Sequence, residues 1–222
     1  MNAPLNAQFI NLLAAILLLI AFAMLSQRRI LSLINLFALQ GLVLAVSAFT
    51  VAAFTGLEHL FWSGAITLVL KVLFLPWLLH RLIRKLNVKW DIEPLLNIPT
   101  TMLLGLALVV FAFNLAQPIS EMSQGVTKST LGIAIACVLL SFVMMITRRK
   151  AVPQVIGFLS MENGLFFAAT SATYGMPMVV ELGIALDVLV GMFVFGVFFF
   201  QIRDTFDSLD LQHMEKLKEP PQ

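Results

Sequence analysis

The sequence predicts an all-α polytopic membrane protein, and three observations support that fold class. Apolar residues make up 60% of the 222 residues and charged residues only 12%, which is about half their usual share in soluble domains. Apolar runs of about twenty residues recur along the chain, and this length lets an α-helix cross the hydrocarbon core of a bilayer. The runs are continuously apolar rather than alternating, so they predict helices and not barrel strands. The composition excludes a soluble fold, a disordered chain, a disulfide scaffold and a nucleic-acid-binding protein.

Hydropathy windows predict about seven transmembrane helices. Their approximate ranges are 5–25, 31–54, 60–83, 98–116, 130–147, 152–173 and 178–202. Cytoplasmic loops carry an excess of Lys and Arg, and twelve of the fourteen basic residues follow an odd-numbered helix. These twelve are Arg28, Arg29, Arg81, Arg84, Lys85, Lys89, Arg148, Arg149, Lys150, Arg203, Lys216 and Lys218. We therefore expect a multi-pass protein of the inner (cytoplasmic) membrane, with its N-terminus outside and its C-terminus in the cytoplasm.

The first three and the last three predicted helices are interpreted as two copies of one unit. Arg28-Arg29 and Arg148-Arg149 each follow the first helix of a copy, and the segment that begins at Gly41 aligns with the one that begins at Gly164. One intervening helix gives both copies the same orientation in the membrane. The predicted organisation is a first three-helix repeat (1–96), a linking helix (97–128), a second three-helix repeat (129–203) and a cytoplasmic tail (204–222). The alternative is seven unrelated helices of similar composition.

Three ionisable side chains lie near the middle of predicted helices: Lys71, Glu162 and Asp187. Each costs at least about 2.5–3.5 kcal/mol to insert, so each is expected to face the protein interior and a pathway or a partner. Glu181 lies closer to the outer interface. The amide Asn163 follows Glu162 directly, and the amide Gln40 lies in the second predicted helix, which has no charged residue. The complete set of candidate residues for a polar axis is Glu162, Asp187, Lys71, Glu181, Gln40 and Asn163.

Two interpretations of these residues stay open. In one, the buried acids and the lysine titrate and pass protons through the membrane; in the other, they form static ion pairs that only fix helix packing. The sequence contains no P-loop, dinucleotide-binding glycine motif, zinc-protease motif or nucleophile elbow. We therefore predict no catalytic site and no cofactor or metal in this chain.

The segment from Gly157 to Gly164, which includes Glu162 and Asn163, resembles hydrogenase-4 component E, and so does the segment from Val180 to Asp187. This resemblance extends over essentially the whole chain. The last three predicted helices are also similar to the K-type subunit of complex I and to the C-type subunit of multisubunit cation/proton antiporters. In those subunits an acid in the second helix and another in the third correspond to Glu162 and Asp187 here. The first copy departs from that pattern, with Gln40 and Lys71 at the corresponding positions.

The resemblance implies a non-catalytic membrane subunit of a hydrogenase-4 or formate hydrogenlyase-type complex related to complex I. Such a subunit would link antiporter-like membrane subunits and contribute to an axis for proton or sodium translocation. The cytoplasmic oxidoreductase arm, typically a nickel–iron hydrogenase with formate dehydrogenase, would hold the nickel–iron and iron–sulfur centres. The alternatives are a purely structural scaffold subunit, a subunit of an antiporter-type complex with a different cytoplasmic arm, and a small self-sufficient transporter.

Overall fold

The computed structural model describes residues 5–86, 96–122 and 128–173, together with Gly191. Its helices all belong to one compact unit, residues 1–184, and the described ranges contain no β-strand. The helices are α1 (Leu5–Ser26), α2 (Ile30–Thr55), α3 (Glu58–Thr67), α4 (Leu75–Leu86), α5 (Ile98–Met122), α6 (Lys128–Thr147) and α7 (Ala151–Thr173). The all-α polytopic fold class predicted from the composition is therefore confirmed.

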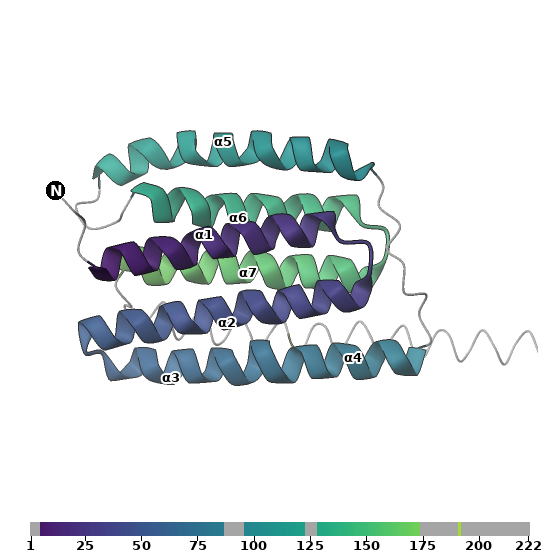
Figure 1. Ribbon diagram of the computed structural model, residues 1–222, viewed down its shortest axis with the longest axis horizontal. Coiled ribbons are helices and arrows are strands. Elements are labelled where there is room, and N and C mark those ends of the chain that lie inside the picture. Colours follow the sequence, from purple (N-terminus) through teal and green to yellow (C-terminus); the bar gives the residue numbers. More distant parts are fainter. Residues whose placement is uncertain (1–4, 87–95, 123–127, 174–190, 192–222) are drawn as a thin grey trace, which may run out of the picture. The chain divides into compact units, whose positions relative to one another are not determined.

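Four helices form the centre of this unit, and the remaining ones cover two of its sides (Figure 1). Helices α1 and α2 pack against each other, and so do α6 and α7. Helix α1 also packs on α6 and α2 on α7, while α5 packs on α6 and α1, and α3 packs on α2. The first two helices of one predicted repeat thus lie against the first two of the other. The third helix of the second repeat, predicted over 178–202, and the tail 204–222 lie outside the described residues, so the repeat stays a prediction.

Five of the described helical segments are long and apolar enough to cross a membrane. They are Gln8–Ser26, Ile30–Thr55, Leu60–Arg81, Ile98–Pro118 and Thr130–Thr147. The first five predicted ranges agree with these segments to within a few residues. The sixth predicted helix is α7, a continuous helix of 23 residues, and its buried face carries the polar residues described below.

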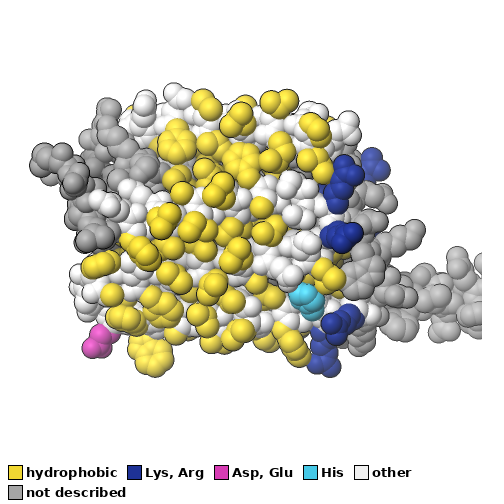
Figure 2. Space-filling model, in the orientation of Figure 1, with side chains coloured by type: hydrophobic (Ala, Val, Ile, Leu, Met, Phe, Trp, Pro, Cys, Tyr) yellow, Lys and Arg dark blue, Asp and Glu magenta, His cyan; other side chains and the backbone are white. Residues whose placement is uncertain are grey.

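The sides of the unit are apolar, as expected for a surface that faces lipid. Large apolar side chains such as Leu19, Leu103 and Ile146 are 68–70% exposed, which would be costly in water over so wide an area. Helix α5 shows the same pattern: small residues, among them Gly105 and Ala112, face its neighbours, and its bulky residues point outward. Figure 2 shows apolar side chains across the middle of one face and Lys and Arg gathered at one end.

One element differs from the regular helix that the sequence predicts. Helix α3 continues into α4 through a π-helical segment, Leu68–Phe74, in which the amide of Leu75 donates to the carbonyl of Leu70. Pro76 lies two residues after the end of this segment and has no amide hydrogen to donate to the carbonyl of Val72, so the wider turn lies where the α-helical pattern would lose a bond anyway. Lys71 is at the centre of the π-helical segment.

Candidate functional site

A buried ion pair joins two helices that are far apart in the sequence. The ammonium of Lys71 lies 3.3 Å from Oε1 of Glu162, and the two side chains are only 1% and 3% exposed. Lys71 comes from the π-helical segment and Glu162 from α7. Both charges therefore lie in the interior of the helix bundle, where the cost of burying each one is offset by the other.

Two amide side chains extend this pair into a network. Lys71 Nζ donates to Oδ1 of Asn163 at 2.8 Å, and Nδ2 of Asn163 donates to Oε1 of Gln40 at 3.2 Å. Both amides are completely buried. We call these four residues, Gln40, Lys71, Glu162 and Asn163, the Lys71 cluster. It connects α2, the π-helical segment and α7, so four of the six candidate residues meet at one place. The other two candidates, Asp187 and Glu181, lie outside the described residues.

A glycine permits the close approach that brings Lys71 to this position. A Cβ atom added at Gly41 of α2 would lie 3.1 Å from Cβ of Lys71 and 3.4 Å from Cγ2 of Val72, which is tighter than ordinary van der Waals contact. The absence of a side chain at Gly41 therefore lets α2 pack directly against the backbone that carries Lys71. The neighbouring Gln40 then points into the same interior and reaches Asn163.

The hydrogen-bonding capacity of the cluster is not fully used by the described residues. Oε2 of Glu162 and Nε2 of Gln40 are buried, and neither has a hydrogen-bond partner within the described part of the chain. The hydroxyl of Ser63, two helical turns before Lys71, is also buried and has no hydrogen-bond partner among the described residues. A buried polar atom without a partner costs roughly 1–3 kcal/mol, and internal water is the usual way in which such atoms are satisfied. The cluster thus has free acceptor and donor positions where water or a mobile proton can bind.

Further polar side chains lie along the same helices. The hydroxyl of Ser141 in α6 lies 2.9 Å from that of Ser160 in α7, and both side chains are buried. On α3, Ser63 and Thr67 are buried as well. Polar residues at intervals of four place Ser63, Thr67 and Lys71 along one side of this continuous helix, although the π-helical turn shifts the last of them.

The structure also buries a charge that sequence reasoning missed. Arg148 follows α6 directly and is one of the basic residues predicted on the cytoplasmic side, yet its side chain is only 2% exposed. Its Nη2 donates to the carbonyl of Leu25, in the last turn of α1, at 2.7 Å. Burial lowers the pKa of the Arg148 guanidinium from its usual value, but arginine keeps its proton in proteins, so the group is a cation at neutral pH. Arg148 therefore caps the negative end of the α1 dipole.

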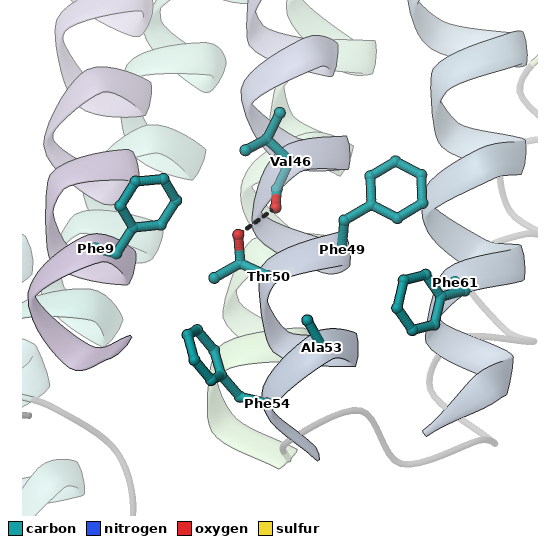
Figure 3. Close-up of a pocket in the computed structure, with 7 residues that line it drawn as sticks. All are labelled: Phe9, Val46, Phe49, Thr50, Ala53, Phe54 and Phe61. Atoms are coloured by element: carbon teal, nitrogen blue, oxygen red, sulfur yellow. Dashed lines mark hydrogen bonds between the residues drawn. The ribbon is translucent and has the colours of Figure 1, made fainter. Parts of the chain in front are cut away.

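A groove at the opposite end of the helices has a different character (Figure 3). Phenylalanines of α1, α2 and α3 line it, and its volume is about 640 Å³. The lining residues are Phe9, Val46, Phe49, Thr50, Ala53, Phe54 and Phe61. The only hydroxyl among them, that of Thr50, already donates to the carbonyl of Val46 at 2.7 Å. The groove is an apolar recess open to the side, and it offers no group for ion or cofactor chemistry.

Metal chemistry has no donor set in the part of the chain that the structure describes. No group of three or more His, Cys, Asp or Glu side chains there could hold an ion. Cys137 is buried in α6 with a free thiol. Within the described ranges, the Lys71 cluster is therefore the candidate functional site.

Comparison with known proteins gives the family. The chain is 33% identical over 218 residues to the uncharacterised protein Rv0085 of Mycobacterium tuberculosis, and the alignment covers 96% of this chain and 99% of that protein. It is 25% identical over 214 residues to hydrogenase-4 component E of Escherichia coli K12 and to the Shigella flexneri protein of the same name, again over 96% and 99% of the two lengths. No family model matches the chain, and no solved structure does. The chain therefore belongs to the family of the mycobacterial protein, and hydrogenase-4 component E is a more distant relative over its full length.

Proposed function

We propose that this chain is a non-catalytic integral membrane subunit of a hydrogenase-4-like respiratory complex and that its Lys71 cluster is part of a proton-translocation axis. The observation that carries the proposal is the buried ion pair between Lys71 and Glu162. Ionisable groups buried at membrane depth commonly mark ion pathways. The full-length similarity to hydrogenase-4 component E supports the type of complex.

The depth of the cluster fits such an axis. Gln40 is ten residues from the start of α2 and Glu162 eleven residues from the start of α7. At a rise of 1.5 Å per residue both lie about 15–17 Å from the basic end of the helices, which is about half the thickness of the hydrocarbon core. Three chain segments thus place polar side chains near the middle of the membrane, where lipid offers them no partner.

The geometry permits a proton to move within the pair. Transfer from Nζ of Lys71 to Oε1 of Glu162 breaks one N–H bond and forms one O–H bond, and it leaves the net charge of the pair unchanged. Asn163 holds the ammonium from its other side at 2.8 Å, and Gln40 fixes Asn163. Rotation of the protonated carboxyl group by half a turn about the Cγ–Cδ bond of Glu162 would carry the proton to the position of the second oxygen, from which it would leave toward water or a further acid. Asp187 and Glu181 are the candidates in this chain for continuing the route.

The proposal includes the partners and the orientation. Antiporter-like membrane subunits would continue the axis on either side, and a cytoplasmic oxidoreductase arm would hold the nickel–iron and iron–sulfur centres. The end of the helices where Lys and Arg gather would face the cytoplasm, with the N-terminus outside the inner membrane. Exposed Arg28, Arg29, Arg81 and Arg84 lie at that end, and exposed Glu58 begins α3 at the other.

A static scaffold is the competing function, because an ion pair between distant helices also fixes their packing. The chemistry of the atoms left unpaired within the described ranges favours the relay, because a carboxylate oxygen can take up a proton, whereas the unpaired Nε and Nη1 of the buried Arg148 cannot. A scaffold gains most when every buried polar atom is paired, whereas Glu162 Oε2 and Gln40 Nε2 have no partner among the described residues. A relay needs such free positions in order to receive and release protons.

The test is Glu162→Gln in the intact complex, with the tagged chain used to identify the subunits that purify with it. We expect antiporter-like and hydrogenase subunits in the purified complex and unchanged assembly on a native gel. Proton uptake by inverted membrane vesicles, measured per electron transferred, should fall at least several-fold. Glu58→Gln is the matched control, since it makes the same chemical change at an exposed position. Loss of subunits from the gel would favour the scaffold, and full proton uptake by the variant would contradict the relay.

A further inference from the structure

The Lys71 ammonium occupies a position where an inorganic cation could bind. Oε1 of Glu162 lies 3.3 Å from it and Oδ1 of Asn163 lies 2.8 Å from it. A carboxylate oxygen together with an amide oxygen is the kind of donor set that binds hard cations in proteins. The ring of Phe166 adds a third attraction, with its centroid 5.8 Å from Nζ, because a π-face stabilises a nearby positive charge.

The surroundings of the ammonium are those of a closed cation site. Lys71, Glu162 and Asn163 are each at most 3% exposed, so the Lys71 ammonium and the oxygens around it are shielded from bulk solvent. Oε2 of Glu162 has no partner within the described residues and would be a third oxygen for an ion in place of the ammonium. Gly41 brings the backbone of α2 against Cβ of Lys71, which leaves no room beside the side chain on that flank.

We propose that Lys71 is a built-in cation that makes the cluster selective for protons by filling the site that sodium would otherwise occupy. When Lys71 is charged, a second cation in the site would meet strong repulsion in a medium of low dielectric constant. When Lys71 has given its proton to Glu162, the amine still fills the volume and the carboxyl group no longer carries a charge. Sodium finds no vacant anionic site in either state, while the proton moves between two atoms that are already in contact.

The conclusion that the transported ion is the proton rests on the proposed function. Whether Lys71 fills a cation site can be tested on this chain alone, without the rest of the complex. It predicts that Lys71→Ala exposes a sodium site. The variant leaves the oxygens of Glu162 and Asn163 around an empty volume with an uncompensated carboxylate. Sodium, or ammonium as a free analogue of the lost side chain, should then bind and stabilise the folded chain.

The experiment measures thermal unfolding of the purified full-length chain in detergent, in sodium chloride and in choline chloride at equal ionic strength. Wild type should show the same melting temperature in both salts. Lys71→Ala should melt roughly 3–6 °C higher in sodium once its concentration is ten times the dissociation constant, and ammonium should also raise it. The double variant Lys71→Ala/Glu162→Gln is the control, and it should lose the response because the anionic oxygen is gone.

Two results would overturn the proposal: a sodium-specific stabilisation of wild type that Glu162→Gln removes, or a folded Lys71→Ala variant that responds to neither sodium nor ammonium. If Lys71→Ala folds only when sodium or ammonium is present during purification, that dependence itself supports the proposal. If the variant folds in none of these salts, the melting temperatures of wild type and Glu162→Gln are the test. A sodium-specific rise in the melting temperature of wild type contradicts the proposal. Equal melting temperatures in sodium and choline for both proteins support it. Failure of the proposed function would appear separately, as absent partner subunits or as unchanged proton uptake in Glu162→Gln. It would not alter the melting temperatures measured here.

Discussion

Within the described residues, two buried cations, Lys71 and Arg148, have different partners. Lys71, in the middle of the helices, is paired with a carboxylate and an amide, whereas Arg148, at the basic end, donates to a backbone carbonyl of α1. Lysine can release its proton when buried, but arginine holds its proton at any physiological pH. The cation that can titrate therefore lies beside an acid at membrane depth, and the one that cannot titrate caps a helix. The difference separates a candidate relay from a structural contact.

The largest effect should come from breaking the central pair on one side. Lys71→Met leaves Glu162 as an uncompensated buried acid, and loss of one partner of a buried pair costs about 3–5 kcal/mol. We expect a fall of that order in the free energy of unfolding, measured by denaturant titration in detergent. The double variant Lys71→Met/Glu162→Gln should recover most of the loss, because it removes the unpaired charge. Equal instability of the single and double variants would mean that the pair contributes packing and not electrostatic balance.

A smaller effect is expected at the other cation. Arg148→Met leaves the Leu25 carbonyl without its donor, and an unsatisfied buried acceptor costs about 1–3 kcal/mol. The same denaturant titration should detect this loss, while proton uptake per electron should stay at the wild-type level. Arg149→Met is the matched control because Arg149 is exposed and should change stability little. A loss of proton uptake in Arg148→Met would contradict the conclusion that Arg148 has a structural role and Lys71 a role in proton transfer.

An effect of similar size is expected at the glycine that lets α2 approach Lys71. Gly41→Ala places a methyl group 3.1 Å from Cβ of Lys71, so the neighbouring backbone must shift slightly, and overpacking of this kind costs about 1–3 kcal/mol. Proton uptake should fall together with stability, because the shift moves Lys71 relative to Glu162. Gly56→Ala is the comparison: Gly56 has φ of 69° and open space around its Cα, so its loss strains the backbone without touching the cluster. Equal uptake in both variants would show that the position of Lys71 tolerates displacement.

The sequence alone predicts the helices and the inward-facing position of Lys71 and Glu162, for physical reasons, but it leaves open whether Glu162 or Asp187 pairs with Lys71. Apolar runs of membrane length predict helices whatever their neighbours are, and the insertion cost of Lys71 and Glu162 requires that they face the interior. The hydrogen bond between Gln40 and Asn163 depends on which faces of α2 and α7 meet. The sequence predicts both residues as candidates for a polar axis, but not that they contact each other.

Two features were beyond sequence reasoning. Arg148 and Arg149 are adjacent and chemically identical in the sequence, and only the position of the end of α1 decides which of them is buried. The π-helical segment likewise cannot be predicted from Leu68–Phe74 itself, which consists of residues that also form ordinary α-helices. Pro76 predicts a lost backbone hydrogen bond close to Lys71, but not that a wider turn accommodates it.

The π-helical segment joins α3 to α4, so the number of residues in it sets how the side chains of the two helices are rotated relative to each other. Each residue of an α-helix advances the side-chain direction by about 100°, so deleting one residue between Leu68 and Phe74 would let the turn relax to an ordinary one. The register of everything beyond it would then change relative to Ser63 and Thr67. Because chain length in this stretch determines which direction Lys71 faces, insertions and deletions there should be far less tolerated over evolutionary time than exchanges of one apolar residue for another.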